Sequence, residues 1–273
     1  MTKTKLLLPL LQLRIAVNFK KRNGSRMLIQ DSLKRKLIIQ EDFPWRLPVL
    51  SNREEAETSE TCDEILKYVG GVDLSFSKDD PSVACGTLVV LDIANLNVLY
   101  QDSSVVKLHI PYIPGFLAFR EAPVLLELLK KMKTSASPFY PQLLMVDGNG
   151  ILHPRGFGLA CHLGVLADLP TIGIGKNLHH VDGLTLAKVR HCLEENSSKD
   201  IITLIGDSGR TLGAAMRSKE GSLKPIFVSV GHSISLATAI KIVKMTCRFR
   251  IPEPIRQADI RSKECLQKLN HEK

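Results

Sequence analysis

Long apolar runs, paired-cysteine motifs and internal repeats are all missing from this chain. No apolar run approaches the roughly 20 residues needed to span a bilayer, so the sequence predicts no transmembrane helix. The six cysteines form no CxxC pair and no zinc-type spacing with histidine; their scatter through apolar stretches is typical of reduced core cysteines. The 273 residues therefore predict one large α/β domain with tails, or two small domains.

Acidic residues are also absent before Asp31. The whole net positive charge of the chain, +9, therefore lies within residues 1–40. Residues 1–40 hold ten of the 37 Lys/Arg and one of the 28 acidic residues, which leaves the remainder with 27 of each. A basic arm favours polyanions through counterion release. Because the body carries no net charge, any nucleic-acid function has to rest on its individual residues.

The first 60 residues predict a weakly structured lead, and ordered structure is expected to begin near Glu64. The apolar run after Lys3 is similar to a short signal peptide, but Pro9 and Arg14 interrupt it. A mitochondrial presequence remains an alternative, because acidic residues are missing there.

The order of expected elements indicates an α/β fold with a mixed sheet. Three apolar stretches separated by turn signals predict an antiparallel meander; helical stripes then alternate with short, fully apolar strands, which is typical of buried parallel strands. This pattern fits an RNase H-like sheet with helices on both faces. Strands are expected at 67–76, 84–92, 96–100 with 105–110, 142–146, 171–174 and 224–230, a hairpin around 207–210, and helices from Pro123, at 158–167, 184–195 and 234–248, and after 254.

Two aspartates stand in apolar strands, where a carboxylate is costly unless it is paired or bound to a metal. Asp73 lies within the stretch 69–76, and Asp147 closes the apolar run 143–146. Considered alone, Asp73 could be an aspartate that forms a salt bridge or lies on an edge strand. Asp147 could simply form a turn with Gly148. Together, on strands expected to be neighbours, they predict a cation between two like charges.

Two further acids are candidates for the same site. Glu121 precedes Pro123 at an expected helix start, where backbone amides favour negative charge. Asp259 is in phase with the inward stripe of the last expected helix. The alternatives are an ordinary first-turn acid for Glu121 and a border residue paired with a neighbouring arginine for Asp259.

Oxygen ligands of this kind favour Mg²⁺ or Mn²⁺ over zinc, and such ions stabilise charge on a phosphoryl group and activate water. His153, in the loop after Asp147, and His232, after an expected strand, are candidate assistants, although a lone loop histidine is more often a surface residue. Lys176 follows another strand and is a candidate phosphate ligand; a solvated lysine is the alternative.

Seven blocks of residues occur in order between roughly 64 and 264. They are VGGVDLSF (69–76), PYIPGFLAFRE (111–121), VDGNGILHPRGFGLACHLGV (146–165), PTIGIGKN (170–177), DSGRTLGAAMRS (207–218), SVGHSISLATA (229–239) and RIPEPIRQADIRS (250–262). In this order they closely resemble the endonuclease V family, and most closely its animal-type members.

The resemblance implies an RNase H-like fold and Mg²⁺-dependent hydrolysis, with Mn²⁺ as an alternative ion, at the second phosphodiester on the 3′ side of inosine. Bacterial-type members act on deoxyinosine-containing DNA, and animal-type members prefer inosine in single-stranded RNA. We expect a monomer with no membrane partner, in the cytoplasm and nucleus, with the nucleolus and mitochondrion as alternatives.

By motif, Asp73 and Asp147 are similar to the principal metal ligands, and Glu121 to a third acid that helps to hold metal and water. The other matches, all expected near the metal or the scissile phosphate, are Asp259, where some members carry histidine, His153 and Lys176.

The PYIPG segment resembles the family's wedge, whose aromatic ring inserts beside the lesion. A base must be unstacked before its edge is read, and glycine-rich main chain is hypothesised to distinguish hypoxanthine from adenine. Nucleic-acid contacts are therefore expected from Tyr112, Ile113, Pro114, Gly115, Gly148, Gly158 and Lys176.

The sequence departs from the family pattern at three places. Ser233 stands where the SVGH block usually continues with arginine, Ala237 stands near an expected acid, and residues 1–60 do not resemble the usual N-terminus. The lost arginine suggests a weakened phosphate contact. We expect an extension over 1–60, a catalytic domain over 61–264 and a tail over 265–273.

Two other functions remain as alternatives. Another RNase H-like nuclease, such as a junction resolvase, would not explain PYIPG or the glycine-rich loop 148–158. A non-catalytic inosine-binding protein, weakened by Ser233 and the altered N-terminus, would not need the intact acids.

Replacing Tyr112 by alanine is expected to weaken binding of inosine-containing RNA while metal binding is retained, because the stacking surface is lost and the acids are not. Base–aromatic stacking contributes about 1–3 kcal/mol, so the affinity should fall at least several-fold in a fluorescence-anisotropy titration. Unchanged affinity would count against the wedge.

Overall fold

The computed structural model describes residues 23–48, 64–111, 113–195, 200–218 and 224–271. Residues 1–22, for which a targeting role is an alternative, and Tyr112 therefore lie outside the described residues. None of the helices described in these ranges is both long enough and apolar enough to cross a bilayer.

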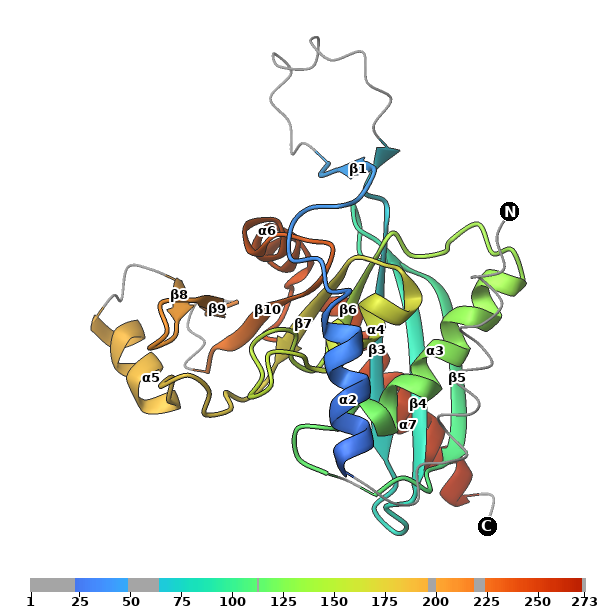
Figure 1. Cartoon of the computed structure of the whole chain (residues 1–273). Helices are drawn as coiled ribbons and strands as arrows, with labels where there is room; N and C mark the ends of the chain where they lie inside the picture. The colour runs from blue at the N-terminus through green and yellow to red at the C-terminus, as the bar shows by residue number, and fades with distance from the viewer. Residues whose placement is uncertain (1–22, 49–63, 112, 196–199, 219–223, 272–273) are drawn as a thin grey trace, which may run out of the picture.

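A single eight-stranded mixed sheet forms the centre of the molecule (Figure 1). Its strands are β3 (Tyr68–Phe76), β4 (Val83–Asp92), β5 (Val98–Lys107), β6 (Leu143–Asp147), β7 (Thr171–Gly175), β8 (Ile201–Ile205), β9 (Thr211–Met216) and β10 (Ile226–His232). They lie in the order β5-β4-β3-β6-β7-β10-β9-β8. The central pairs β3–β6 and β6–β7 are parallel, and the flanking pairs are antiparallel. A separate parallel pair joins β1 (Trp45–Arg46) to β2 (Glu64–Ile65).

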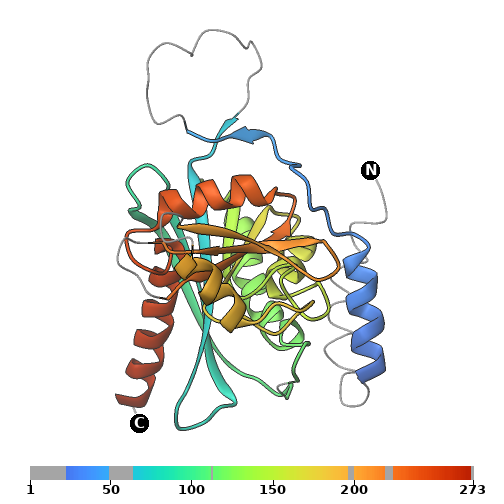
Figure 2. The same cartoon turned by 90° about the vertical axis from the view of Figure 1, so that its left-hand side faces the viewer.

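Helices cover both faces of this sheet, as the sequence predicts. They are α2 (Asn23–Lys34), α3 (Ala118–Thr134), α4 (Leu159–Ala167), α5 (Leu186–Glu195), α6 (Leu236–Thr246) and α7 (Glu253–His271). Helices α3 and α4 pack on one face, α6 and α7 on the other, and α2 lies on α4. Figure 2 shows α2 and α7 on opposite sides of the sheet.

Alternation along the central strands divides the core into two layers. Met145 belongs to the layer under α6 and α7, with Ile242 and Ile255, because successive strand residues point to opposite faces. Its neighbour Leu144 belongs to the layer under α3 and α4, with Leu129. Since Asp147 follows Met145 by two residues, its side chain leaves the sheet on the α6/α7 side.

The start of one predicted helix was wrong. Helix α3 begins at Ala118, about one turn before the predicted start, so Pro123 lies inside the helix. Phe119 and Ala122 are buried and extend the apolar stripe upstream. The stretches 96–100 and 105–110 belong to one strand, β5, as predicted, and its polar middle reflects the exposed alternate side chains of an edge strand.

The N-terminal segment contains more structure than the sequence suggested. Helix α2 lies within residues 1–60, and α7 continues through most of the expected tail to His271. Two polar residues on the inward face of α2 hid its periodicity, because an apolar stripe is the usual signal. That face consists of Arg26, Ile29, Gln30 and Leu33.

Close contact between β3 and α7 requires a residue without a side chain at Gly71. A Cβ there would lie 2.0 Å from the carbonyl oxygen of Pro254, in the first turn of α7. Replacing Gly71 by alanine is expected to destabilise the fold by about 1–3 kcal/mol, because backbone has to move. Chemical denaturation measures the change.

The matched control is Gly24→Ala in α2, where an added Cβ meets no atom within 4 Å. This variant should leave the free energy of unfolding unchanged or slightly raised. Equal stability of the two variants would mean that α7 does not sit tightly on β3.

Candidate active site

The register of β3 and β6 brings Asp73 and Asp147 together. Val72 pairs with Val146 in this parallel ladder, so the two aspartates come next on their strands and point to the same face. Asp73 is 7% exposed. This register, together with the effect of Asp147 on the pKa of Asp73, shows that the structure brings the two acids together, as predicted.

Helices α3 and α7 and the loop after β7 complete a cluster around this pair. Glu121 lies in the first turn of α3 and is 7% exposed. Lys176 Nζ lies 2.5 Å from Asp147 Oδ2 and 3.9 Å from Asp259 Oδ1. Five of the six residues predicted as catalytic therefore converge from four elements and one loop.

Burial and mutual repulsion raise the pKa values of two acids in the cluster. Burial, then the charge of Asp147 and a hydrogen bond with it, raise the pKa of Asp73 to about 7. Burial, then the charges of Asp73 and Asp147, raise the pKa of Glu121 to about 8. The cluster thus holds more negative charge than its surroundings neutralise.

Lys176 supplies positive charge to the cluster but cannot balance it alone. Burial acts to lower the pKa of Lys176, whereas Asp147, followed by Asp73 and Asp259, raises it by more, so the net shift is upward. Lys263 lies 2.7 Å from Asp259 on the exposed side of α7. Against four carboxylates these ammonium groups leave a negative excess, which protons or a cation must offset.

A divalent cation fits the chemistry of this donor set, because carboxylate oxygens of several elements surround one buried spot. Among the described residues no three acidic, histidine or cysteine side chains are already arranged as a cation cage. Asp147 is instead held by Lys176. The residues that would hold the ion are Asp73, Asp147 and Glu121.

Two hydroxyl groups contact Asp73 that the sequence alone did not assign to the site. Ser75 Oγ and Ser262 Oγ donate to Asp73 Oδ2 at 3.4 and 3.2 Å, and lie 2.7 Å from each other. The available signals were their spacings, because Ser75 follows Asp73 by two on the same strand face and Ser262 follows Asp259 by three on a helix. These hydroxyls fix the orientation of one Asp73 oxygen.

The structure does not bring His153 into hydrogen-bonding contact with the acids. Its Nδ1 accepts the Arg155 backbone N–H at 3.2 Å. Burial, then the positive charges of His179 and Arg155, lower the pKa of His153 to about 4. His232 has a structural role, since it is buried and its Nδ1 accepts the Ile38 N–H at 3.3 Å.

The described part of the wedge segment forms a turn before α3. The Phe116 N–H donates to the carbonyl of Ile113 at 3.0 Å, Pro114 is exposed, and Gly115 has φ = +79°. This φ favours glycine. Ile113 to Gly115 are thus presented at the surface.

Glycines of the loop after β6 are required by the fold itself. A Cβ on Gly158 would lie 2.2 Å from the carbonyl oxygen of Asn149, and one on Gly148 would lie 3.2 Å from Leu159. Loop packing therefore explains both glycines, and contact with a base, which was their expected role, stays a prediction.

Ser233, where the resemblance led us to expect an arginine, anchors the segment that precedes β1. It is buried with φ = +50°, and its N–H donates to the Ile38 carbonyl at 2.8 Å. Glu41 of the same segment accepts hydrogen bonds from Ser235 and Thr238 at the start of α6. A carboxylate thus lies at this helix start although Ala237 provides none.

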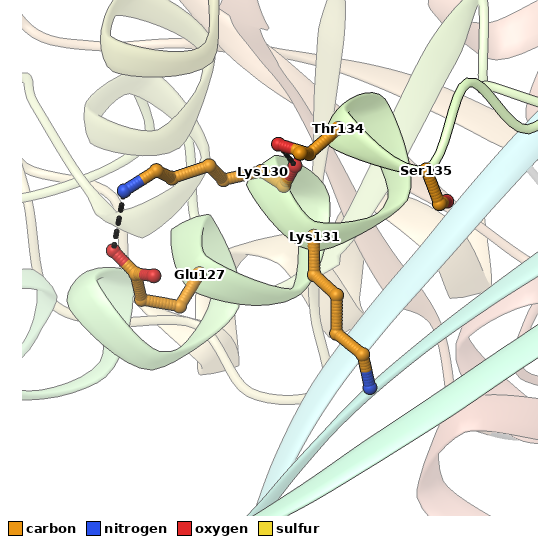
Figure 3. Close-up of a pocket in the computed structure, with 5 residues that line it drawn as sticks. All are labelled: Glu127, Lys130, Lys131, Thr134 and Ser135. Carbon is orange, nitrogen blue, oxygen red and sulfur yellow. Dashed lines mark hydrogen bonds and ion pairs between the residues drawn. The ribbon is translucent and has the colours of Figure 1, made fainter.

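A shallow cavity of about 350 Å³ lies at the other end of α3 from Glu121 (Figure 3). Glu127, Lys130 and Lys131 line it, together with Thr134 and Ser135. Lys130 is paired with Glu127 at 3.8 Å and Lys131 with Asp102 at 2.7 Å. The cavity is no part of the acid cluster.

Comparison with known proteins agrees with this geometry. The family model described as Endonuclease V matches residues 51–260. The chain belongs to the endonuclease V family. It is 53% identical over 206 residues to endonuclease V of Mus musculus, covering 74% of this chain and 61% of the mouse protein.

Solved structures of the family share the fold. Human endonuclease V gives a TM-score of 0.81 at 44% identity, covering 91% of this chain and 100% of the human one. Endonuclease V of Ciona intestinalis, in complex with a DNA containing an inosine followed by a ribo-adenosine, gives 0.78 at 33% identity, covering 90% and 98%. The predicted RNase H-like fold and the predicted family are therefore confirmed, for a chain that spans about three-fifths of the mouse relative's length.

In metal-free buffer, Glu121→Gln is expected to raise the melting temperature more at about pH 8 than at about pH 5. The folded state holds the pKa of Glu121 at about 8, above its ordinary value of 4.5, so it binds more protons than the unfolded state between these values. The free energy of unfolding of the wild type therefore falls as pH rises through this window. Because glutamine at position 121 cannot ionise, the free energy of unfolding of the variant falls less.

Thermal melts of both proteins at the two pH values check this, with Glu127→Gln as the control. Glu127 lies on the same helix, and its side chain is 73% exposed. A Glu121→Gln shift that is the same at both pH values would contradict the charge repulsion inferred for the cluster.

Proposed function

We propose that this chain is a Mg²⁺-dependent endonuclease that hydrolyses the second phosphodiester bond on the 3′ side of inosine. It prefers single-stranded RNA and retains activity on deoxyinosine-containing DNA. Mn²⁺ serves as an alternative ion. The protein acts as a monomer in the cytoplasm and nucleus.

The acid cluster carries this proposal. Burial, followed by the charge of Asp147, raises the pKa of Asp73, and burial, followed by the charges of Asp73 and Asp147, raises the pKa of Glu121. A phosphodiester-cleaving site needs such a concentration of negative charge to hold a divalent ion. Endonuclease V relatives supply the substrate class, because one of them is seen with inosine-containing DNA.

Each residue of the acid cluster has a separate role, which follows from its position. When bound, Mg²⁺ neutralises charge on the phosphoryl group and makes water a better nucleophile. Asp73, Asp147 and Glu121 would hold the ion, Ser75 and Ser262 orient Asp73, and Glu121 would also help to position the attacking water.

Lys176 is the residue that binds the phosphate. Its ammonium group already lies between two carboxylates, and its raised pKa keeps it charged at neutral pH. Asp259 is a positioning residue for Lys176. His153, neutral at this pH because its pKa is lowered, is available to donate a hydrogen bond through Nε2.

Recognition of inosine rests on Tyr112 and the turn of Ile113, Pro114 and Gly115 that follows it. Gly148 and Gly158 allow the loop 148–158 to pack tightly on itself and on the start of α4, and this loop supports the turn of residues 113–115. The wedge unstacks the hypoxanthine base from its neighbouring bases, and main-chain groups form hydrogen bonds with the edge of this base.

A single-stranded RNA with one inosine should be cut by the wild type in Mg²⁺, and EDTA should abolish cutting. Asp73→Ala should reduce the rate at least about 100-fold, because a buried ligand is lost. Fragment lengths on a sequencing gel give the position of the cut, and an all-adenosine RNA and a deoxyinosine DNA give the specificity.

Glu127→Ala is the control for loss of an acid. Cutting that continues in EDTA would refute metal dependence, and equal rates on inosine and adenosine would refute the substrate. Tight binding of inosine RNA without any cutting in Mg²⁺ would identify a non-catalytic reader.

A further inference from the structure

Helix α2 lies outside residues 51–260, which match the family model, yet it contacts two loops that border the acid cluster. The loop 113–117 leads into α3, which carries Glu121. The loop 148–158 leaves β6, which ends at Asp147, and leads into α4. In Figure 2, α2 stands as a separate helix at the edge of the molecule away from α7.

Gln30, on the inward face of α2, joins both loops with one side chain. It is 1% exposed. Its Nε2 donates to the carbonyl of Phe157 at 2.9 Å and to that of Gly115 at 3.3 Å. Its Oε1 accepts from Arg155 Nε. Both amide protons and the amide oxygen are thus used, which a glutamine achieves only in a fixed geometry.

Arg155 extends this connection. Its guanidinium group donates to Asp31 Oδ1 at 3.0 Å and lies 5.2 Å from the centre of the Phe116 ring. Lys34 Nζ donates to the Arg155 carbonyl at 2.8 Å. Three residues of α2 therefore hold Arg155, which in turn contacts the loop 113–117.

A hydrogen-bonding side chain at the centre of the contact between α2 and the two loops fixes the distance between the loops more strictly than an apolar side chain would. A buried carbonyl that loses its donor is left without a hydrogen bond, which is unfavourable, so the loops have one favoured spacing. Apolar packing alone would tolerate sliding of the loops.

We propose that Gln30 is a positioning residue that sets the spacing of the two substrate-contacting loops, with α2 as its support. This inference rests on the proposed function, because it assigns these loops to the binding of inosine-containing RNA. Three of the four acids, Asp73, Asp147 and Asp259, lie on β3, β6 and α7, and the fourth, Glu121, lies on α3, which packs against α4. Gln30 therefore acts on substrate binding rather than on the chemical step.

The main test compares Gln30→Leu with the wild type on inosine-containing RNA in Mg²⁺. Loss of two hydrogen bonds to the loops should raise KM about tenfold, while kcat changes less than about twofold. Hydrogen exchange, measured without RNA, should become faster in peptides covering 113–117 and 148–158 and stay unchanged in β3 and β6.

Two further variants separate the contacts. Gln30→Glu keeps the acceptor for Arg155 and removes both donors, so it should raise KM like Gln30→Leu. Asp31→Asn weakens only the pairing with Arg155 and should raise KM less. Leu28→Ala is the matched control, because Leu28 is 72% exposed on the outer face of α2, and it should leave KM unchanged.

An unchanged KM in both Gln30 variants would overturn the proposal. A fall in kcat and melting temperature at constant KM would also overturn it, because it would show that α2 only stabilises the fold. A wild type that leaves inosine RNA uncut would reject the proposed function instead.

Discussion

Mutual repulsion among buried carboxylates is the constraint on which the site depends. Asp73 and Glu121 are withdrawn from water and face the charge of Asp147, so the pKa values of both rise. A fold keeps such a cluster only where neighbouring layers hold it rigidly, because each acid would gain by moving into solvent. The site stores unfavourable electrostatic energy that the proposed divalent ion would relieve, so affinity for the ion would come at the expense of stability.

Backbone geometry provides the rigidity. The parallel register of β3 and β6 leaves the two aspartates side by side, and a one-residue slip would send one of them to the opposite layer. Helix α7 contributes Ser262 and Asp259 from above, and its first turn rests directly on Gly71. The same face of β3 therefore fixes both the acid and the helix that orients it.

The sequence predicted the parts of this arrangement that follow from periodicity. Buried strands were recognisable as apolar runs, and Asp73 and Asp147 were conspicuous because they interrupt or close such runs. Helix α2 escaped because polar Gln30 occupies its inward face, and the start of α3 was misplaced because Pro123 is tolerated within the helix. The hydroxyls of Ser75 and Ser262, which donate to Asp73, were missed because a serine two or three residues from an aspartate is too common a spacing to mark a site by itself.

Three hydrogen bonds from α2 to its loops end on carbonyl oxygens of the main chain, at Gly115, Arg155 and Phe157, and Arg155 is the loop residue whose side chain α2 also binds. Every residue type presents the same carbonyl, so the identity of most loop side chains is irrelevant to this contact. Other side chains of the loops can therefore be exchanged without a change in the helix that supports them. A fixed backbone path is compatible here with many different sets of loop side chains.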